Sequence, residues 1–578
     1  MSAAEWARSR FGDVRGPIAL WMDTVASRPS WARAFGVALV ALLALTALSG
    51  IGLSFTYAPS TASAWASVYF TEFVLGSGWY VRSLHVAAAE GSIVIGVVGL
   101  VLATLEGRYR GRRDLAFYMH AVMIAIALAF CITGNPLRWD NRGYYGFLVE
   151  TNIAGELPGG KLLRALALGG SEAGNFTLTR LYALHTLALP LVCAGLLWVW
   201  SRSSRAASEA EGAPRETGSQ LVRDGVATLV TVLGVAVLAY LVRAPLESPA
   251  DPIATYNARP EWYFSSLYVL RNAVPASMQA IVAGGAPVVV GALIFAVPWL
   301  DRDPDASFGR RAPALLALLV PVGLAVILTL VAMRHDAKDP DLQKSHAAAM
   351  KTTHRALQVA QVQGIPPAGA LAMMRNDPVT RGEDLFRDKC ATCHKLGDLG
   401  PADGKLTAPT LDGFGTEQWA VAVMENPDAP DLFGNTAYRG RMPSLTRPPT
   451  DPALAKDWKA TSKGDIDAMA AFLAGEAAES PRSQEGAKLI KQRCTGCHLF
   501  RGATDDDGGF GPELGGWGST AWLRAQIANP GTNATYRAAS MSTAMEGHMP
   551  RSDADLSADD IDLLARFVRG RGRGRAAK

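Results

Sequence analysis

Two short strings in the chain have the residue types and spacing that attach haem covalently. Residues 390–394 (CATCH) and 494–498 (CTGCH) both read Cys-x-x-Cys-His. In this motif the cysteines form thioethers with the haem vinyl groups and the histidine binds iron. A structural zinc site or a disulfide would not need a histidine directly after the second cysteine. We therefore predict two c-type haems and an electron-carrying function. The predicted haem-binding residues are Cys390, Cys393 and His394 in the first motif, and Cys494, Cys497 and His498 in the second.

Each motif lies in the same order of elements. A polar helix (381–390 and 484–494) runs into the motif, a Met-Pro pair follows in a loop, and an amphipathic helix (464–474 and 558–569) ends the segment. This order resembles class I cytochrome c twice over, in domains spanning residues 378–476 and 482–574. The resemblance implies that Met442 is the sixth ligand of the first haem and Met549 that of the second.

Neighbouring residues compete with Met549 for the second iron. Met541 and Met545 precede it, and His548 would give a bis-histidine haem of lower reduction potential. We expect Met549, because its Met-Pro sequence and its distance to the last helix mirror those of Met442.

The chain is longer than a dihaem carrier requires. It has 578 residues, and its hydrophobic content of 49% is concentrated before residue 334. The formal net charge of +4 is too small for this length to indicate nucleic-acid binding. Four of the six cysteines lie in the haem motifs. Cys131 and Cys193 lie in apolar runs, so no disulfide framework is predicted.

Seven apolar runs are long enough to cross a bilayer. Arginines cluster before the first run, between the second and third, after the fourth, and between the sixth and seventh, which assigns those loops to the cytoplasm. Residues 334–578 then lie outside, where c-type haem is attached. We expect a multi-pass protein of the bacterial inner membrane, without a cleavable signal peptide, whose N-terminus is cytoplasmic and whose haem c domains are periplasmic. The runs are Ala34–Thr56, Val86–Thr104, Leu115–Gly134, Leu181–Trp200, Gly225–Val242, Met278–Leu300 and Ala312–Met333.

Two histidines enter the membrane from the predicted periplasmic side. His85 opens the second run and His185 opens the fourth. Ionisable residues inside a span are costly and are candidates for function. A lone histidine on an apolar face is more often a core residue. Two at similar depth on neighbouring helices meet the requirement for bis-histidine haem ligation in a four-helix bundle.

The surrounding residues resemble cytochrome b of the respiratory bc and photosynthetic bf complexes, most closely the bf type, over about the first 340 residues. The matching strings are, in order, residues 55–59 (FTYAP), 82–85 (RSLH), 139–140 (WD), 177–185 (TLTRLYALH) and 260–263 (PEWY). The last of these corresponds to the signature of the family's quinol-oxidation site.

The resemblance implies roles for individual residues. Arg82 and Arg180 would pair with haem propionates, and Gly50 and Gly134 would let the haem edge approach two helices. Glu261 would accept a proton from quinol. The full predicted quinol site is Pro260, Glu261, Trp262 and Tyr263.

The chain departs from the family where a second b haem should bind. The family carries a second histidine fourteen or fifteen residues after each first one, and those positions are Gly99 and Trp200 here. His120 stands where the family has a glycine, although Gly36 is kept. We therefore predict a single non-covalent haem b. Two interpretations of His120 stay open: it fills the lost pocket together with Trp200, or it binds a displaced cofactor there.

Glu90 lies one turn beyond His85 and is a second ionisable residue within a span. It could belong to a proton path, a salt bridge or a water-lined site, and these alternatives stay open.

The predicted fold class is all-α, with a seven-helix cytochrome b-type bundle followed by two small helical cytochrome c domains. Residues 1–205 would form the four-helix haem bundle, and residues 206–333 the three-helix part with the quinol motif. Residues 334–377 read as a linker with one short helix.

These resemblances imply a membrane subunit of a quinol:cytochrome c oxidoreductase, or one serving another periplasmic acceptor. It would oxidise quinol at the periplasmic face and pass electrons through one haem b and two haems c. No iron–sulfur cysteine set exists in the chain, so a Rieske-type subunit would be a separate protein. The expected partners are membrane lipid, that subunit and a periplasmic acceptor, in a dimer or larger complex without nucleic acid.

The alternative is a non-catalytic membrane anchor and electron-transfer subunit, in a complex with a sister cytochrome b. Loss of one haem site would fit such a role. Retention of all four residues 260–263 argues against it, because an acidic residue such as Glu261 is costly to bury without a function.

Overall fold

The computed structural model describes residues 30–157, 159–210, 218–302, 308–402, 405–449, 455, 458–475, 480–500, 511–532, 534–536 and 549–575. Over these ranges the protein is helical and forms no β-strand beyond isolated bridges. The chain divides into two compact units, an N-terminal unit (residues 1–372) and a C-terminal unit (residues 373–578).

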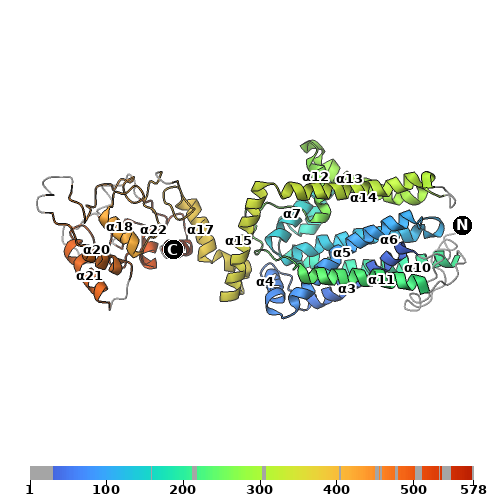
Figure 1. Cartoon of the computed structure of the whole chain (residues 1–578), viewed down its shortest axis with the longest axis horizontal. Coiled ribbons are helices and arrows are strands. Elements are labelled where there is room, and N and C mark those ends of the chain that lie inside the picture. The colour runs from blue at the N-terminus through green and yellow to red at the C-terminus, as the bar shows by residue number, and fades with distance from the viewer. Residues whose placement is uncertain are drawn as a thin grey trace. The chain divides into compact units, whose positions relative to one another are not determined.

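Seven helical segments in the N-terminal unit are long and apolar enough to cross a membrane, which confirms the predicted number. They run side by side in Figure 1. Side chains such as Val230, Ile281 and Val288 are more than half exposed on them, as expected of surfaces that face lipid. The segments are α3 (Trp31–Ser54), α5 (Gly78–Leu105), α6 (Asp114–Gly134), the continuous run α9 (Asn175–Ala183), η4 (Leu184–Ala188) and α10 (Leu189–Ala210), then α11 (Gly218–Leu241), α13 (Ala276–Leu300) and α14 (Ala312–Asp336).

The long helices form two groups. α3 packs against α5 and α11, and α6 packs against α5 and α10, whereas α13 and α14 pack against each other and against the short helix α12 (Ser265–Asn272). The groups meet in a buried cluster that includes Leu100, Phe117, Val297 and Leu318. This arrangement places α5 and α6 at the centre of the unit.

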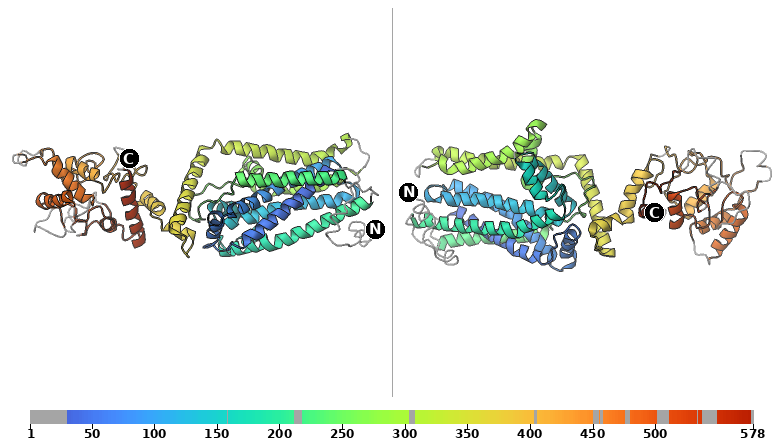
Figure 2. Two further views of the ribbon diagram at one scale, coloured as in Figure 1. Left: turned by 60° about the horizontal axis from the view of Figure 1, so that its bottom comes forward. Right: turned by 180° about the vertical axis from the view of Figure 1, so that it is seen from behind.

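Short helices cover the end of the bundle where α5 begins. They are α4 (Ala64–Tyr69), the π-helix η1 (Phe70–Val74), the 3₁₀ turn η3 (Asn135–Arg138), α7 (Asn141–Gly155), α8 (Gly160–Leu168) and the 3₁₀ turn η5 (Trp262–Phe264). A further helix, α15 (Pro340–Gln363), runs across this end in Figure 1 and Figure 2. The backbone N–H of Ser248 donates to Thr353 Oγ1 at 3.0 Å, which fixes α15 to the loop beneath it.

The segment 334–377 differs from the expected linker with one short helix. α14 continues to Asp336, and α15 is 24 residues long. Asp339 caps α15 by accepting from the N–H groups of Asp341 and Leu342, and Pro340 occupies its first turn. No glycine or proline interrupts the helix before Gly364, so its propensity favours a long element.

After the short helix α16 (Ala370–Arg375), the described residues of the C-terminal unit include two sets of three helices. The first repeat supplies α17 (Pro378–Lys389), α18 (Glu417–Glu425) and α20 (Lys463–Leu473). The second supplies α21 (Pro481–Arg493), α22 (Thr520–Ala528) and α24 (Ala558–Arg575). Equivalent caps begin equivalent helices, since Thr416 accepts from Trp419 N–H and Ser519 from Trp522 N–H.

These helices do not pack as two self-contained repeats. α17 packs against α24, and α20 packs against α21, so the first helix of each repeat meets the last helix of the other. Two buried cores result. One joins α17 to α22 and α24, and the other joins α18 and α20 to α21.

Candidate functional sites

His85 and His185 face each other inside the N-terminal unit. His85 lies on α5, and His185 lies in η4, a π-helical turn of the kind often found at functional sites. Their ring centroids are 6.2 Å apart. Two metal–imidazole bonds of about 2 Å, with roughly 1 Å from each nitrogen to its ring centre, give about 6 Å. The spacing therefore fits one iron held between the two rings.

Hydrogen bonds orient both rings through the same nitrogen. His85 Nδ1 lies 3.0 Å from the carbonyl oxygen of Thr46, and His185 Nδ1 lies 3.0 Å from Thr133 Oγ1. Within the described residues neither Nε2 has a hydrogen-bond partner. Such outer contacts fix the ring and leave the other nitrogen for a metal.

Two glycines let these rings approach the neighbouring helices. A Cβ added at Gly50 would lie 3.0 Å from His85 Cε1, and one at Gly134 would lie 2.9 Å from His185 Cε1. Contacts this short would displace either ring. The residues present thus fit a bis-histidine haem at this end of the bundle.

Arg82 and Arg180 have protein partners in the structure. Arg82 is buried and donates from Nε to Glu72 Oε2 at 2.7 Å, and it also donates to the carbonyls of Ala244 and Pro245. Arg180 is exposed and donates to the Leu166 carbonyl at 2.9 Å. Pairing of these arginines with haem propionates stays a prediction.

The opposite end of the bundle shows the same kind of contact with different residues. A Cβ at Gly99 would lie 2.9 Å from His120 Cε1, and one at Gly36 would lie 3.0 Å from Trp200 Cζ2. His120 is buried, and its Nε2 lies 2.9 Å from the Gly96 carbonyl. Trp200 and His120 thus contact these glycines as His85 and His185 contact theirs, and pocket filling by Trp200 and His120 stays a prediction.

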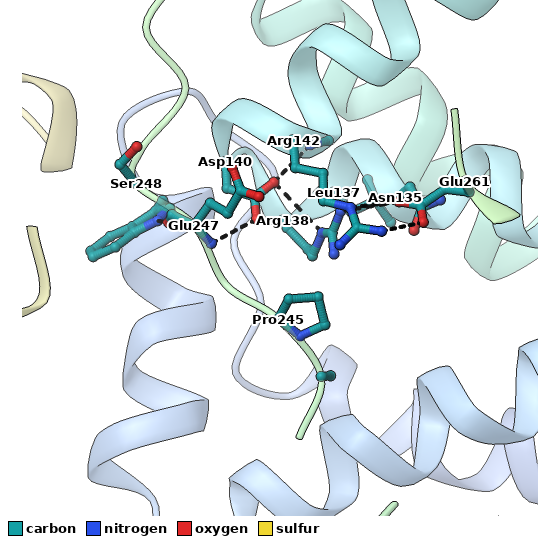
Figure 3. A network of polar contacts seen from close by, with 12 residues as sticks. Asn135, Leu137, Arg138, Asp140, Arg142, Pro245, Glu247, Ser248 and Glu261 are labelled. Atoms are coloured by element: carbon teal, nitrogen blue, oxygen red, sulfur yellow. Dashed lines mark hydrogen bonds and ion pairs between the residues drawn. The ribbon is translucent and has the colours of Figure 1, made fainter. Parts of the chain in front are cut away.

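The predicted quinol motif lies at the His85 end, where Glu261 is held by arginine. Arg142 donates from Nη2 to Glu261 Oε2 at 2.6 Å and from Nε to Oε1 at 3.1 Å. Arg138 Nη2 lies 3.9 Å from the same carboxylate and also approaches Asp140. Figure 3 shows both arginines between Asp140 and Glu261. The site is therefore a bidentate ion pair with a second cation close by.

The aromatic residues of the motif reach the central helices. Asn135 Nδ2, next to Gly134, donates to the Tyr263 hydroxyl at 2.8 Å. The Tyr263 ring packs against a cluster formed by α5 and α6. Pro260 is half-buried and constrains the extended backbone that leads into Glu261.

Glu90 also contacts the motif. Trp262 Nε1 donates to Glu90 Oε2 at 3.1 Å. Glu90 thus has a hydrogen bond to the predicted quinol motif, and the three alternatives for its role stay open.

Several functional candidates were not predicted. Arg142, Asn135 and Glu72 are polar residues whose partners lie on other elements, so no local pattern marked them. The 139–140 string was the only signal near Arg142. Glu150 on α7 is another: burial raises the pKa of its carboxyl to about 8, and the negative charge of Glu261 acts in the same direction.

The two haem c motifs have the same local geometry. The N–H of His394 donates to the Cys390 carbonyl at 2.9 Å, and that of His498 donates to the Cys494 carbonyl at 2.8 Å. His394 Nδ1 lies 2.8 Å from the Pro409 carbonyl, and His498 Nδ1 lies 3.0 Å from that of Pro512. Burial lowers the pKa of both imidazoles, which keeps them neutral as iron ligands. Both motifs therefore fit covalent haem.

Each methionine packs on the core that contacts the haem motif of the other repeat, whereas we expected it to pair with the motif of its own repeat. Met549 packs on the core that also contacts Cys390, and Met442 packs on the core that also contacts Cys494. Gln526 Nε2 lies 3.8 Å from Met549 Sδ. The competing residues Met541, Met545 and His548 lie outside the described residues.

Comparison with known families matches both units. The family described as cytochrome b/b6/petB matches residues 23–200, and cytochrome b(C-terminal)/b6/petD matches residues 249–350. The cytochrome c family matches twice, over residues 379–475 and 483–571.

Curated relatives agree. A cytochrome b6 of Chlamydomonas reinhardtii is 33% identical over 147 residues, which cover 25% of this chain and 68% of that protein. A cytochrome b/c1 of Bradyrhizobium diazoefficiens is 26% identical over 311 residues, 51% of this chain and 45% of that protein. A cytochrome bc complex cytochrome b subunit of Chlorobaculum thiosulfatiphilum is 29% identical over 283 residues, 46% of this chain and 65% of that protein. The chain spans less than two thirds of the last two.

Proposed function

Because the chain belongs to the cytochrome b family and carries two cytochrome c domains after its membrane helices, we propose that it is the membrane subunit of a quinol oxidoreductase. The subunit oxidises quinol at the periplasmic face and passes the electrons to cytochrome c or another periplasmic acceptor.

The observation that carries this proposal is the environment of Glu261. Its carboxylate and the Tyr263 hydroxyl belong to one short segment, and Tyr263 packs on the same two helices that carry His85 and Gly134. Oxidation of a quinol needs a group that takes a proton and an electron acceptor near the ring. This end of the bundle provides the first and fits a haem that provides the second.

Arg142 holds both carboxylate oxygens of Glu261, donating from Nε to Oε1 and from Nη2 to Oε2. A quinol hydroxyl that gives its proton to Glu261 must compete with this bidentate contact, so the contact positions the carboxylate and opens during turnover. Arg142 has 39% of its side-chain surface accessible, which leaves the guanidinium room to move away.

The cofactors follow from the ligand sets. His85 and His185 would hold one haem b, and the two Cys-x-x-Cys-His motifs would hold two haems c. When bound, these groups supply one-electron transfer. Gly99 and Trp200 cannot bind iron, so the chain holds no second haem b at the opposite end.

The remaining partner is inferred from what the chain lacks. Its six cysteines leave none for an iron–sulfur cluster beyond the two haem motifs and two separate thiols. We therefore assign the first electron to a separate Rieske-type subunit in a larger complex. From the arginine-rich loops we also propose a cytoplasmic N-terminus and a periplasmic haem c unit in a bacterial cell.

Substitution of Glu261 tests the proposal. Glu261→Gln keeps the side-chain shape but removes the proton acceptor, so quinol-dependent reduction of the c haems should fall at least tenfold, while dithionite reduction and spectra stay unchanged. Glu172→Gln, an exposed carboxyl on the loop before α9, is the matched control and should keep the wild-type rate. Quinol oxidation at the wild-type rate by Glu261→Gln would instead favour the non-catalytic anchor.

A further inference from the structure

We infer that the two haem c sites are exchanged between the repeats. The haem attached at residues 390–394 takes Met549 as its sixth ligand, and the haem attached at residues 494–498 takes Met442. Each site is then built from the attachment half of one repeat and the methionine half of the other. This inference rests on the cytochrome c match and does not depend on quinol oxidation.

Close glycine contacts identify which helices pair. In α17, a Cβ at Gly382 would lie 2.3 Å from Phe567 Cβ on α24. In α21, a Cβ at Gly486 would lie 2.0 Å from the Ala468 carbonyl and 3.1 Å from Phe472 Cβ on α20. Gly382 and Gly486 each lie eight residues before the first cysteine of their motif, and Phe472 and Phe567 are at matching places in the terminal helices. The same contact thus occurs twice, each time between repeats.

The methionines follow the helices. Met549 leads into α24, and both pack on the core formed by Leu385, Phe386 and the residues around Cys390. Met442 precedes α20, and both pack on the core that includes Leu489, Ile490 and Cys494. Neither core contains the methionine of the repeat that supplied its attachment motif. The Met-Pro methionine that shares a core with each motif therefore comes from the other repeat.

The chain segments that connect the halves cross at a pair of glycines. Residues 411–419 (LDGFGTEQW) and 514–522 (LGGWGSTAW) are equivalent in the two repeats. A Cβ added at Gly518 would lie 3.4 Å from Gly415 Cα, and the φ angles of these glycines are +70° and +79°. Only glycine adopts this backbone readily and allows such close approach.

Aromatic side chains close the crossing. The Phe414 and Trp517 rings lie 4.9 Å apart, and the Trp419 and Trp517 rings are stacked at 5.4 Å. Trp419 donates to the Thr410 carbonyl and Trp522 to the Glu513 carbonyl, both at 3.0 Å. Equivalent residues of the two repeats thus form one shared cluster, and this favours a pair of interlocked halves.

Chain connectivity gives a physical reason for the exchange. Only residues 474–480 separate α20 from α21, and helices joined by a short connection pack as neighbours at low entropic cost. α17 and α24 are then left to pair. Ion pairs join α17 to α24, because Arg381 contacts Asp560 and Arg571 contacts Glu383. Arg571 also contacts Asp398, which follows the first haem motif.

Ligand variants in the full-length protein test the exchange. A chain with Cys390→Ala and Cys393→Ala carries only the second haem c. In that chain Met442→Ala should abolish the methionine–iron charge-transfer band of the ferric haem, and Met549→Ala should leave it in place. Met469→Leu, a buried residue in the same core as Met442, is the matched control and should keep the band. Loss of the band with Met549→Ala, and its retention with Met442→Ala, would overturn the inference.

A second measurement keeps the test decisive if the single-haem chains do not fold. A protease site inserted between Gly475 and Ser480 is cut in the folded, full-length protein with both haems. Exchanged halves should stay together in detergent at high salt, and denaturant that separates them should remove both methionine bands together. Release of a C-terminal fragment that keeps its haem and its methionine band would contradict the exchange. Neither readout involves quinol, so failure here is distinct from failure of the proposed function.

Discussion

At both ends of the membrane bundle, glycines contact rings from neighbouring helices, but the rings differ between the two ends. At one end the surfaces of Gly50 and Gly134 contact His85 and His185. At the other end the surfaces of Gly36 and Gly99 contact Trp200 and His120. In each case a glycine admits a ring from a neighbouring helix.

The difference is in the geometry of the rings. The ring centroids of His85 and His185 lie 6.2 Å apart, and hydrogen bonds fix the Nδ1 atom of each ring. At the opposite end the Nε2 of His120 lies 2.9 Å from the Gly96 carbonyl oxygen, and the Trp200 indole contacts Gly36. On the proposed single haem b, exchanging the places of one glycine and one histidine and replacing a second histidine with tryptophan would close a haem pocket while the helices stay in place.

Removing one ring from each end should give the largest difference. His85→Ala removes an iron ligand, so the b-type absorption band should disappear while the c bands remain. His120→Ala leaves a cavity at the filled end and should lower thermal stability without loss of the b band. Reduced-minus-oxidised spectra of the purified protein measure both effects. Loss of the b band in His120→Ala would contradict the account and make His120 a ligand.

Filling the glycine surfaces should give a smaller difference of the same sign. Gly134→Val would push His185 out of position, so haem b content should fall by at least about fivefold, because packed interiors do not absorb added methyl groups. Gly36→Val is the matched variant at the other end and should lower stability only. Equal haem b content in both variants would show that the glycine contact at His185 is not needed for binding.

Glu150, on the helix α7 that covers the His85 end, should make the stability of the protein depend on pH. The folded protein keeps the Glu150 proton up to about pH 8, whereas the unfolded chain loses it near the ordinary carboxyl value of 4.5. Stability should therefore fall as the pH rises from about 4.5 to 8. Glu150→Gln cannot lose a proton, so its melting temperature should exceed that of the wild type by a few degrees above pH 8 and by little near pH 5. A constant difference between the two across this range would refute the assigned pKa.

For inhibitors of quinone reduction we expect no effect on turnover. If the chain holds the single haem b that we propose, the end with Trp200 and His120 has no haem relay to a quinone-reduction site, so inhibitors of the family's quinone-reduction site should not change the turnover of this chain. The measurement is quinol oxidation in complex free of any other cytochrome b. Inhibition there would show that the closed pocket still takes part in electron transfer.

The residues explain why some of this could be predicted and some could not. The seven spans, the two histidines and the haem c motifs depend on local periodicity or on spacing along the chain, and these are visible in the sequence. The Arg142–Glu261 pair joins residues 119 positions apart, and no local pattern encodes such a partner. The long helix α15 was missed because its composition is polar, which reads as a linker until the cap at Asp339 is considered.

The exchange in the C-terminal unit was hidden for a different reason. Both repeats have the same order of helix, motif, methionine and helix, so the sequence alone allows either terminal helix to pack against either first helix. Only the tertiary structure shows that Gly382 packs against Phe567 and Gly486 against Phe472. Order along the chain favours pairing Met442 with the first motif, and the ligand variants test that pairing against the exchange.

The number of haem b groups per chain tests the comparison of the two ends most directly. Pyridine haemochrome analysis of the purified chain should give one haem b for every two haems c. This ratio follows from one bis-histidine pair and two covalent attachment motifs. Two haem b for every two haems c would contradict the account, since the end closed by Trp200 and His120 would then hold a haem.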